Sequence, residues 1–301
     1  MRRRFAVLSA LFALGLMLTG CGTAAGASAS ADGRIAVVAS TNVYGSIAEL
    51  VGGDRVSVTS LIGRPGQDPH SYEANAQDKL SVSKARLAVE NGGGYDDFFD
   101  VLAHGVLDPN KIINVVGLSG LETNANRNDF NEHVWYSLDV VSTLADTIAA
   151  RLAAIEPANA PAFTANAAAF KASLAPLKSQ LATLRGAHGG QPVAITEPIP
   201  LYLLQAAGLE NRTPAAYSHA IEAGTDVPAG VLKETEDLIS SRSVKFLAYN
   251  SQTEGPQTEV LAKAARDHGV PVVDFTETLP EGQDYVHWMG SNVAAVAAAL
   301  S

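Results

Sequence analysis

Residues 161–185 read PAFTANAAAFKASLAPLKSQLATLR and predict one long helix in the middle of the chain. Apolar side chains recur there at spacings of three and four, which places them on one helical face; they are Phe163, Ala167, Phe170, Leu174, Leu177, Leu181 and Leu184. Pro161 is typical of a first helical turn, and Gly186 is typical of the residue after a helix. At 1.5 Å per residue the helix would measure about 37 Å, enough to cross a domain. We predict a linking helix over residues 158–186; the alternative is an ordinary surface helix of a single domain.

Short β-rich runs alternate with helical patterns on both sides of this helix, which is typical of parallel sheets covered by helices. The expected strands are 35–39, 56–62, 86–90, 111–116, 192–196, 244–249 and 270–275. The expected helices are 41–51, 139–155, 201–207, 231–241, 258–268 and 285–300. The predicted fold class is therefore α/β. Two lobes with mostly parallel sheets flanked by helices, residues 34–157 and 187–301, are joined by the linking helix.

The N-terminus has the pattern of an export signal. Three arginines, Arg2, Arg3 and Arg4, precede an apolar run over residues 5–18. This run is too short to span a membrane, which needs about 20 residues, and it is typical of a signal peptide. The sequence Leu18-Thr19-Gly20-Cys21 resembles a bacterial lipobox, and Cys21 is the only cysteine. We expect a signal peptide over 1–20, lipidation at Cys21, and a flexible tether over 21–33. The protein would then be exported and anchored by lipid at the outer face of the cytoplasmic membrane; the alternative is an ordinary secretory signal.

Composition excludes several classes of protein. The chain has 301 residues, 47% apolar and 17% charged, which is too apolar for a disordered chain. Its net charge of −10 argues against a nucleic-acid partner, because phosphates need a Lys/Arg surface. A single cysteine excludes an intrachain disulfide and a CxxC site.

Polar residues that bind metals follow four of the expected strands. His70 comes after strand 56–62, His133 after strand 111–116, Glu197 after strand 192–196, and Glu277 after strand 270–275. Ligands of open parallel sheets bind just past the carboxyl ends of the strands. Two imidazoles and two carboxylates suit a divalent ion such as Zn²⁺ or Mn²⁺. The other histidines have no ligand spacing and are expected to be surface or structural residues: His104, His188, His219, His268 and His287.

Four short motifs carry a resemblance that covers nearly the whole chain. They are DPHSYE at 68–73, ENGGG at 90–94, EHVW at 132–135 and EPANA at 156–160. With them, the chain resembles the metal-binding lipoproteins that deliver Zn²⁺ or Mn²⁺ to bacterial ABC importers. The resemblance implies a binding protein rather than an enzyme, monomeric, with the metal ion as cargo and an ABC permease as partner.

The resemblance also implies a ligand set between the lobes. His70 and His133 take the positions of the N-terminal ligands. Glu197 occupies the third position, where zinc-type members usually have His and manganese-type members usually have Glu. Glu277 falls where the family normally has Asp, so Asp274 is the alternative fourth ligand. The His-rich loop common in zinc-type members is absent between His70 and His133.

Two other functions compete with metal capture. A metal-dependent hydrolase would need an open ligand position and a separate general base, and the chain has no HExxH or GxSxG motif. A binding protein for an organic solute usually has an aromatic-lined site, whereas aromatic residues make up 6% of this chain. The ion stays open between Mn²⁺, which carboxylates favour, and Zn²⁺, which has the higher intrinsic affinity.

Overall fold

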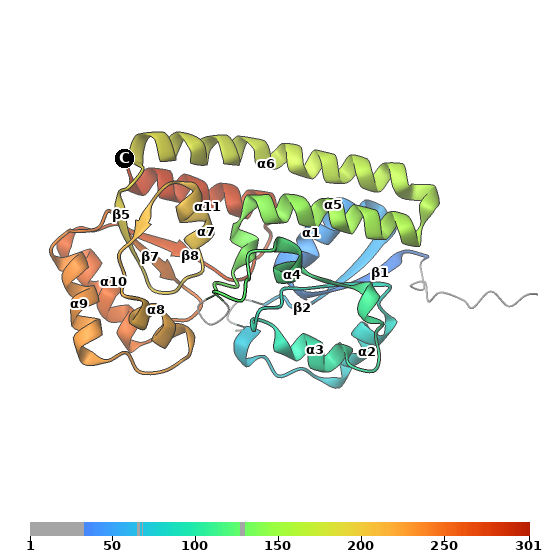
Figure 1. Ribbon diagram of the computed structural model, residues 1–301, viewed down its shortest axis with the longest axis horizontal. Coiled ribbons are helices and arrows are strands. Elements are labelled where there is room, and N and C mark those ends of the chain that lie inside the picture. The colour runs from blue at the N-terminus through green and yellow to red at the C-terminus, as the bar shows by residue number, and fades with distance from the viewer. Residues whose placement is uncertain (1–32, 65–66, 68, 127–129) are drawn as a thin grey trace, which may run out of the picture.

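The computed structural model describes residues 33–64, 67, 69–126 and 130–301 (Figure 1). The expected signal peptide, Cys21 and all of the tether except residue 33 lie outside the described residues. In the part of the chain that is described, no helix has both the length and the apolar character needed to cross a membrane.

The N-terminal lobe is a parallel sheet in the order β2-β1-β3-β4, with helices on both faces (Figure 1). Adjacent residues of β1 face opposite sides, so Val37 packs against α1 and α5 while Val38 packs against α2 and α3. The strands are β1 Ile35–Thr41, β2 Val56–Ile62, β3 Leu87–Glu90 and β4 Ile112–Asn114. The helices are α1 Asn42–Gly52, α2 Ala76–Lys84, α3 Asp97–Ala103, α4 Val115–Ser119 and α5 Leu138–Ile155, with short 3₁₀ turns η1 Gly53–Arg55, η2 Pro69–Ser71, η3 Pro109–Lys111, η5 Val134–Tyr136 and η6 Pro157–Asn159.

The C-terminal lobe repeats this arrangement with a parallel sheet in the order β6-β5-β7-β8. Its strands are β5 Pro192–Ile195, β6 Glu210–Asn211, β7 Leu247–Asn250 and β8 Val272–Phe275. Its helices are α7 Leu201–Ala206, α8 Ala215–Glu222, α9 Ala229–Ser240, α10 Pro256–His268 and α11 Tyr285–Ala299. In both lobes the carboxyl ends of the strands carry the loops that were expected to hold metal ligands.

The long linking helix is confirmed as α6, Ala160–His188, which passes along both lobes with α5 and α11 beside it (Figure 1). Of its predicted apolar face, all side chains are buried except Leu177, which is partly buried. These side chains belong to one buried cluster that continues from β1 and α1 to β8 and α11. The predicted fold class is therefore confirmed, and the apolar core of the lobes is continuous through α6.

One predicted strand, 111–116, is partly wrong. β4 ends at Asn114, and Val115 and Val116 begin α4. The Asn114 side chain accepts a hydrogen bond from the Gly117 amide at 2.8 Å, which caps the first turn of α4. The other predicted strands are present with ends shifted by up to three residues.

Glu90 at the end of β3 gives the fold a pH-dependent stability. It is 5% exposed, and burial raises the pKa of its carboxyl from 4.5 to about 7. The folded protein therefore binds a proton more tightly than the unfolded chain, so stability rises as pH falls from about 7 to 4.5. Above pH 7 the buried charge costs up to about 3 kcal/mol.

Glu90→Gln should remove this cost, since Asn114 Nδ2, which donates to Glu90 Oε1 at 2.9 Å, can donate equally to an amide oxygen. Denaturant unfolding of the metal-free protein should show the variant more stable than the wild type at pH 8, by up to about 3 kcal/mol, and not at pH 4. The same difference at both pH values would contradict the assignment of the pKa to Glu90.

Candidate metal centre

The four residues predicted from strand ends line one cavity of about 700 Å³ between the lobes. His70 lies in η2, His133 directly precedes η5, Glu197 follows β5, and Glu277 follows β8. Consecutive members of this set are at least 63 positions apart in the sequence, and the fold brings them to one cavity. Within the described part of the chain, none of the other histidines lines this cavity.

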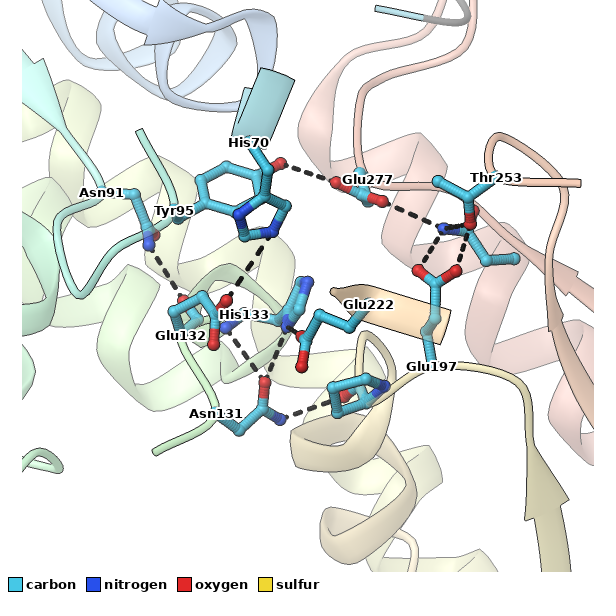
Figure 2. Close-up of polar contacts among 12 residues, drawn as sticks. His70, Asn91, Tyr95, Asn131, Glu132, His133, Glu197, Glu222, Thr253 and Glu277 are labelled. Carbon is cyan, nitrogen blue, oxygen red and sulfur yellow. Dashed lines mark hydrogen bonds and ion pairs between the residues drawn. The ribbon is translucent and has the colours of Figure 1, made fainter. Parts of the chain in front are cut away.

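His70 lines the cavity, and its side chain is 29% exposed. Its ring meets the Tyr95 ring edge-on, with 5.2 Å between centroids, and its Nε2 lies 3.7 Å from Glu132 Oε1. One ligand atom from each of His70, Glu132 and His133 lies within 4.8 Å of the others, a spacing that a metal ion can bridge. Figure 2 shows these three side chains, all from the N-terminal lobe, close to one another.

His133 is 1% exposed and is held in one orientation. Its Nδ1 lies 2.7 Å from Asn131 Oδ1, an acceptor, so Nδ1 carries the proton and Nε2 has the free lone pair. Burial, and next the neighbouring His70, hold the pKa of His133 well below its usual value. The imidazole is therefore neutral and prepared to bind a metal at neutral pH.

The ENGGG turn at 90–94 positions the backbone next to His133. Asn91 Nδ2 donates to the Glu132 carbonyl at 3.0 Å, while Asp96 accepts from the amides of Asn91 and Gly92 at 2.7 Å each. Gly92 has φ +77°, and a Cβ there would lie 2.2 Å from Asn114 Nδ2. Glycine is therefore required at this position. The turn that it allows places Asn91 where its side chain holds the backbone next to His133.

The C-terminal lobe contributes two buried carboxylates, Glu197 at 4% and Glu277 at 3% exposure. Asn250, the last residue of β7, donates through Nδ2 to Glu197 Oε2 at 2.8 Å and to Glu277 Oε1 at 3.0 Å. The Thr253 hydroxyl also donates to Glu197, and the Tyr95 hydroxyl donates to Glu277 Oε2 at 3.3 Å across the cleft (Figure 2). These neutral donors hold two negative charges side by side without neutralising them.

Asp274, the alternative fourth residue, lies elsewhere. It is exposed on β8 and lines a separate hollow with Tyr249 and Lys263. Successive residues of a strand face opposite sides, so Phe275 is buried and Asp274 is not. The structure brings Glu277, and not Asp274, into the cavity with the histidines.

Two further acids, Glu132 and Glu222, belong to the site and were not predicted. Burial raises the pKa of Glu132 to about 7. Burial, and then the charges of Glu132, Glu197 and Glu277, raise the pKa of Glu222 to about 8. The position of Glu132 directly before His133 could have indicated that it lies at the site. No feature of the sequence indicated this for Glu222, because the short helix α8 was not predicted.

No Lys or Arg is found among the described residues that line the cavity. Five acids do line it: Glu197, Glu222, Asp226, Glu254 and Glu277. Carboxylates gathered in a partly buried space repel one another unless a cation compensates them. With two imidazoles in the same cavity, the arrangement fits a divalent metal ion.

A family model described as "Zinc-uptake complex component A periplasmic" matches residues 37–299. Among curated proteins, the manganese-binding lipoprotein MntA of Bacillus subtilis is 33% identical over 162 residues, which cover 52% of this chain and 51% of that protein. The metal ABC transporter substrate-binding lipoprotein ScbA of Streptococcus cristatus is 28% identical over 169 residues, covering 53% and 54%. The chain thus aligns with about half the length of these curated relatives.

Solved structures are similar over most of the chain. The substrate-binding protein FpvC of Pseudomonas aeruginosa, in complex with Mn²⁺, has a TM-score of 0.72 and 25% identity, covering 89% of this chain and 98% of that one. A Mn-bound periplasmic metal binding protein of Candidatus Liberibacter asiaticus has a TM-score of 0.70 at 21% identity, covering 89% and 100%. At 21% identity, the likeness to this second structure shows a shared fold and nothing more.

Proposed function

This chain belongs to the family of the periplasmic zinc-uptake complex component A, and from that premise we propose that it captures Zn²⁺ or Mn²⁺ between its lobes and delivers the ion to an ABC importer. The observation that carries the proposal is the convergence of two imidazoles and two carboxylates in one cavity whose described lining has no Lys or Arg. The relatives named above are metal-binding lipoproteins and substrate-binding proteins.

We propose His70, His133, Glu197 and Glu277 as the ligands. Support for the histidine pair comes from the free Nε2 of His133 and from the spacing of His70 to His133. Support for the carboxylate pair comes from their shared donor, Asn250, which orients one oxygen of each toward the same point. Two anionic ligands neutralise a 2+ ion, which makes its burial tolerable.

The ligand chemistry favours Mn²⁺ as the cargo. Carboxylate oxygens suit Mn²⁺, and Glu at the third position, as here at Glu197, is usual in manganese-type members of the family. MntA of Bacillus subtilis is named for manganese, and FpvC was solved with Mn²⁺. Zn²⁺ is the competing ion because it binds most such sites more tightly.

The proposed place of action is the outer face of the cytoplasmic membrane, with the protein anchored as a monomer through acylated Cys21 and facing an ABC permease. The lobes, residues 34–157 and 187–301, would close only slightly on the ion, since α6 and the continuous core join them rigidly. Lipoproteins among the relatives support the anchor.

Equilibrium dialysis followed by elemental analysis tests capture against its alternatives. The purified protein should bind one equivalent of Mn²⁺ or Zn²⁺ and show no hydrolytic turnover, since four protein ligands leave no open position on zinc. Dialysis against both ions together then identifies the preferred cargo. A bound organic solute without metal, or metal-dependent hydrolysis, would overturn the proposal.

A further inference from the structure

Glu222 reaches the metal cavity from α8, an element that carries none of the four proposed ligands. Its side chain points from α8 toward His133 (Figure 2). Its Oε1 is shielded from solvent and accepts no hydrogen bond from the described residues. The distance from this oxygen to His133 Nδ1 is 3.9 Å, which is too long for a hydrogen bond.

Within the described part of the chain, no cationic side chain meets this oxygen. The described lining of the cavity has no Lys or Arg, and Nδ1 of His133 already donates to Asn131. A buried carboxylate oxygen without a donor is costly, and in native proteins such a group normally meets a cation or a metal. The ion captured in the same cavity is the positive charge that this oxygen can meet.

We infer that Glu222 is a further ligand of the captured ion and that it makes the site favour Mn²⁺ over Zn²⁺; this inference rests on the proposed function. Zn²⁺ is satisfied by four donors in tetrahedral sites, and the four proposed ligands already supply them. Mn²⁺ accepts up to six donors and prefers oxygen. A fifth side chain, with a carboxylate oxygen, therefore stabilises bound Mn²⁺ more than bound Zn²⁺.

Glu222→Ala tests the inference, with Glu254→Ala as the matched control. Glu254 lines the same cavity but is exposed, so its removal takes a carboxyl group from the wall without removing a proposed ligand. Chelator competition should show Glu222→Ala binding Mn²⁺ about tenfold or more weakly, as expected when a group beside the ion is lost. The Zn²⁺ affinity of Glu222→Ala, and both affinities of Glu254→Ala, should change less than about threefold, as for a surface charge.

Pulsed electron paramagnetic resonance of the Mn²⁺-loaded proteins in D₂O gives a second readout. Loss of a ligand opens a coordination position, so Mn²⁺ in Glu222→Ala should carry more exchangeable water than in the wild type or in Glu254→Ala. Equal loss of Mn²⁺ and Zn²⁺ affinity, effects equal to those of Glu254→Ala, or an unchanged water count would each overturn the inference and leave the proposed function standing. A wild-type protein that binds neither ion would refute the proposed function itself.

Discussion

Replacing either His70 or His133 with alanine should reduce the affinity for Mn²⁺ or Zn²⁺ by at least about 100-fold, or about 2.8 kcal/mol at ~1.4 kcal/mol per tenfold. Each change removes one of the two imidazoles found among the described residues that line the cavity. The hydrogen bond between Nδ1 of His133 and Asn131 already orients Nε2 of this imidazole. His133→Ala therefore removes a donor that is held in position before the metal binds. Isothermal titration of the metal-free proteins measures the effect directly.

His268→Ala is the control for the histidine variants. His268 is exposed at the end of α10, outside the cavity lining, and its removal should change the affinity less than about threefold. His133 is almost fully buried, whereas the His70 side chain is partly exposed, so unfolding of the metal-free proteins must accompany the titrations. Small and equal effects from all three substitutions would show that the ion binds elsewhere.

Glu277→Gln should weaken metal binding by about 10- to 100-fold, while Asp274→Asn should leave it within about threefold of the wild type. The two positions are three residues apart at the end of one strand, so the pair separates the two candidate fourth ligands. Glu277 is buried beside Glu197 and receives hydrogen bonds from Asn250 and Tyr95, whereas Asp274 faces a different hollow.

The physical basis of this difference is charge. The amide in Glu277→Gln keeps the shape of the side chain but removes one of the two negative charges that neutralise the ion. Asp274→Asn removes a charge from an exposed surface, which is worth little. Competition with a metal-sensitive dye at constant pH measures both variants. If Asp274→Asn proved as damaging as Glu277→Gln, the assignment of the fourth ligand would be wrong.

The long-range features of the fold follow from sequence periodicity. The apolar face from Phe163 to Leu184 predicted α6 because a helix that joins two lobes must bury one continuous stripe. The position of the cavity followed from the rule that ligands bind at the carboxyl ends of parallel strands, and it brought His70, His133, Glu197 and Glu277 together.

Local features that depend on tertiary contacts were not accessible in this way. Val115 and Val116 look like strand residues, and only the hydrogen bond from the Gly117 amide to the Asn114 side chain shows where the helix begins. Helix α8 is eight residues long and has no side-chain cap, so nothing in the sequence indicated that Glu222 would reach the cavity. The choice between Glu277 and Asp274 depends on which face of β8 is buried.

Anomalous X-ray diffraction from a crystal of the Mn²⁺-loaded protein locates the bound ion and its ligands. We expect one strong manganese peak between the lobes, bonded to the imidazoles of His70 and His133 and to the carboxylates of Glu197 and Glu277. A strongest peak outside this cavity, or a manganese ion in it that touches neither imidazole, would show that these four residues do not form the binding site.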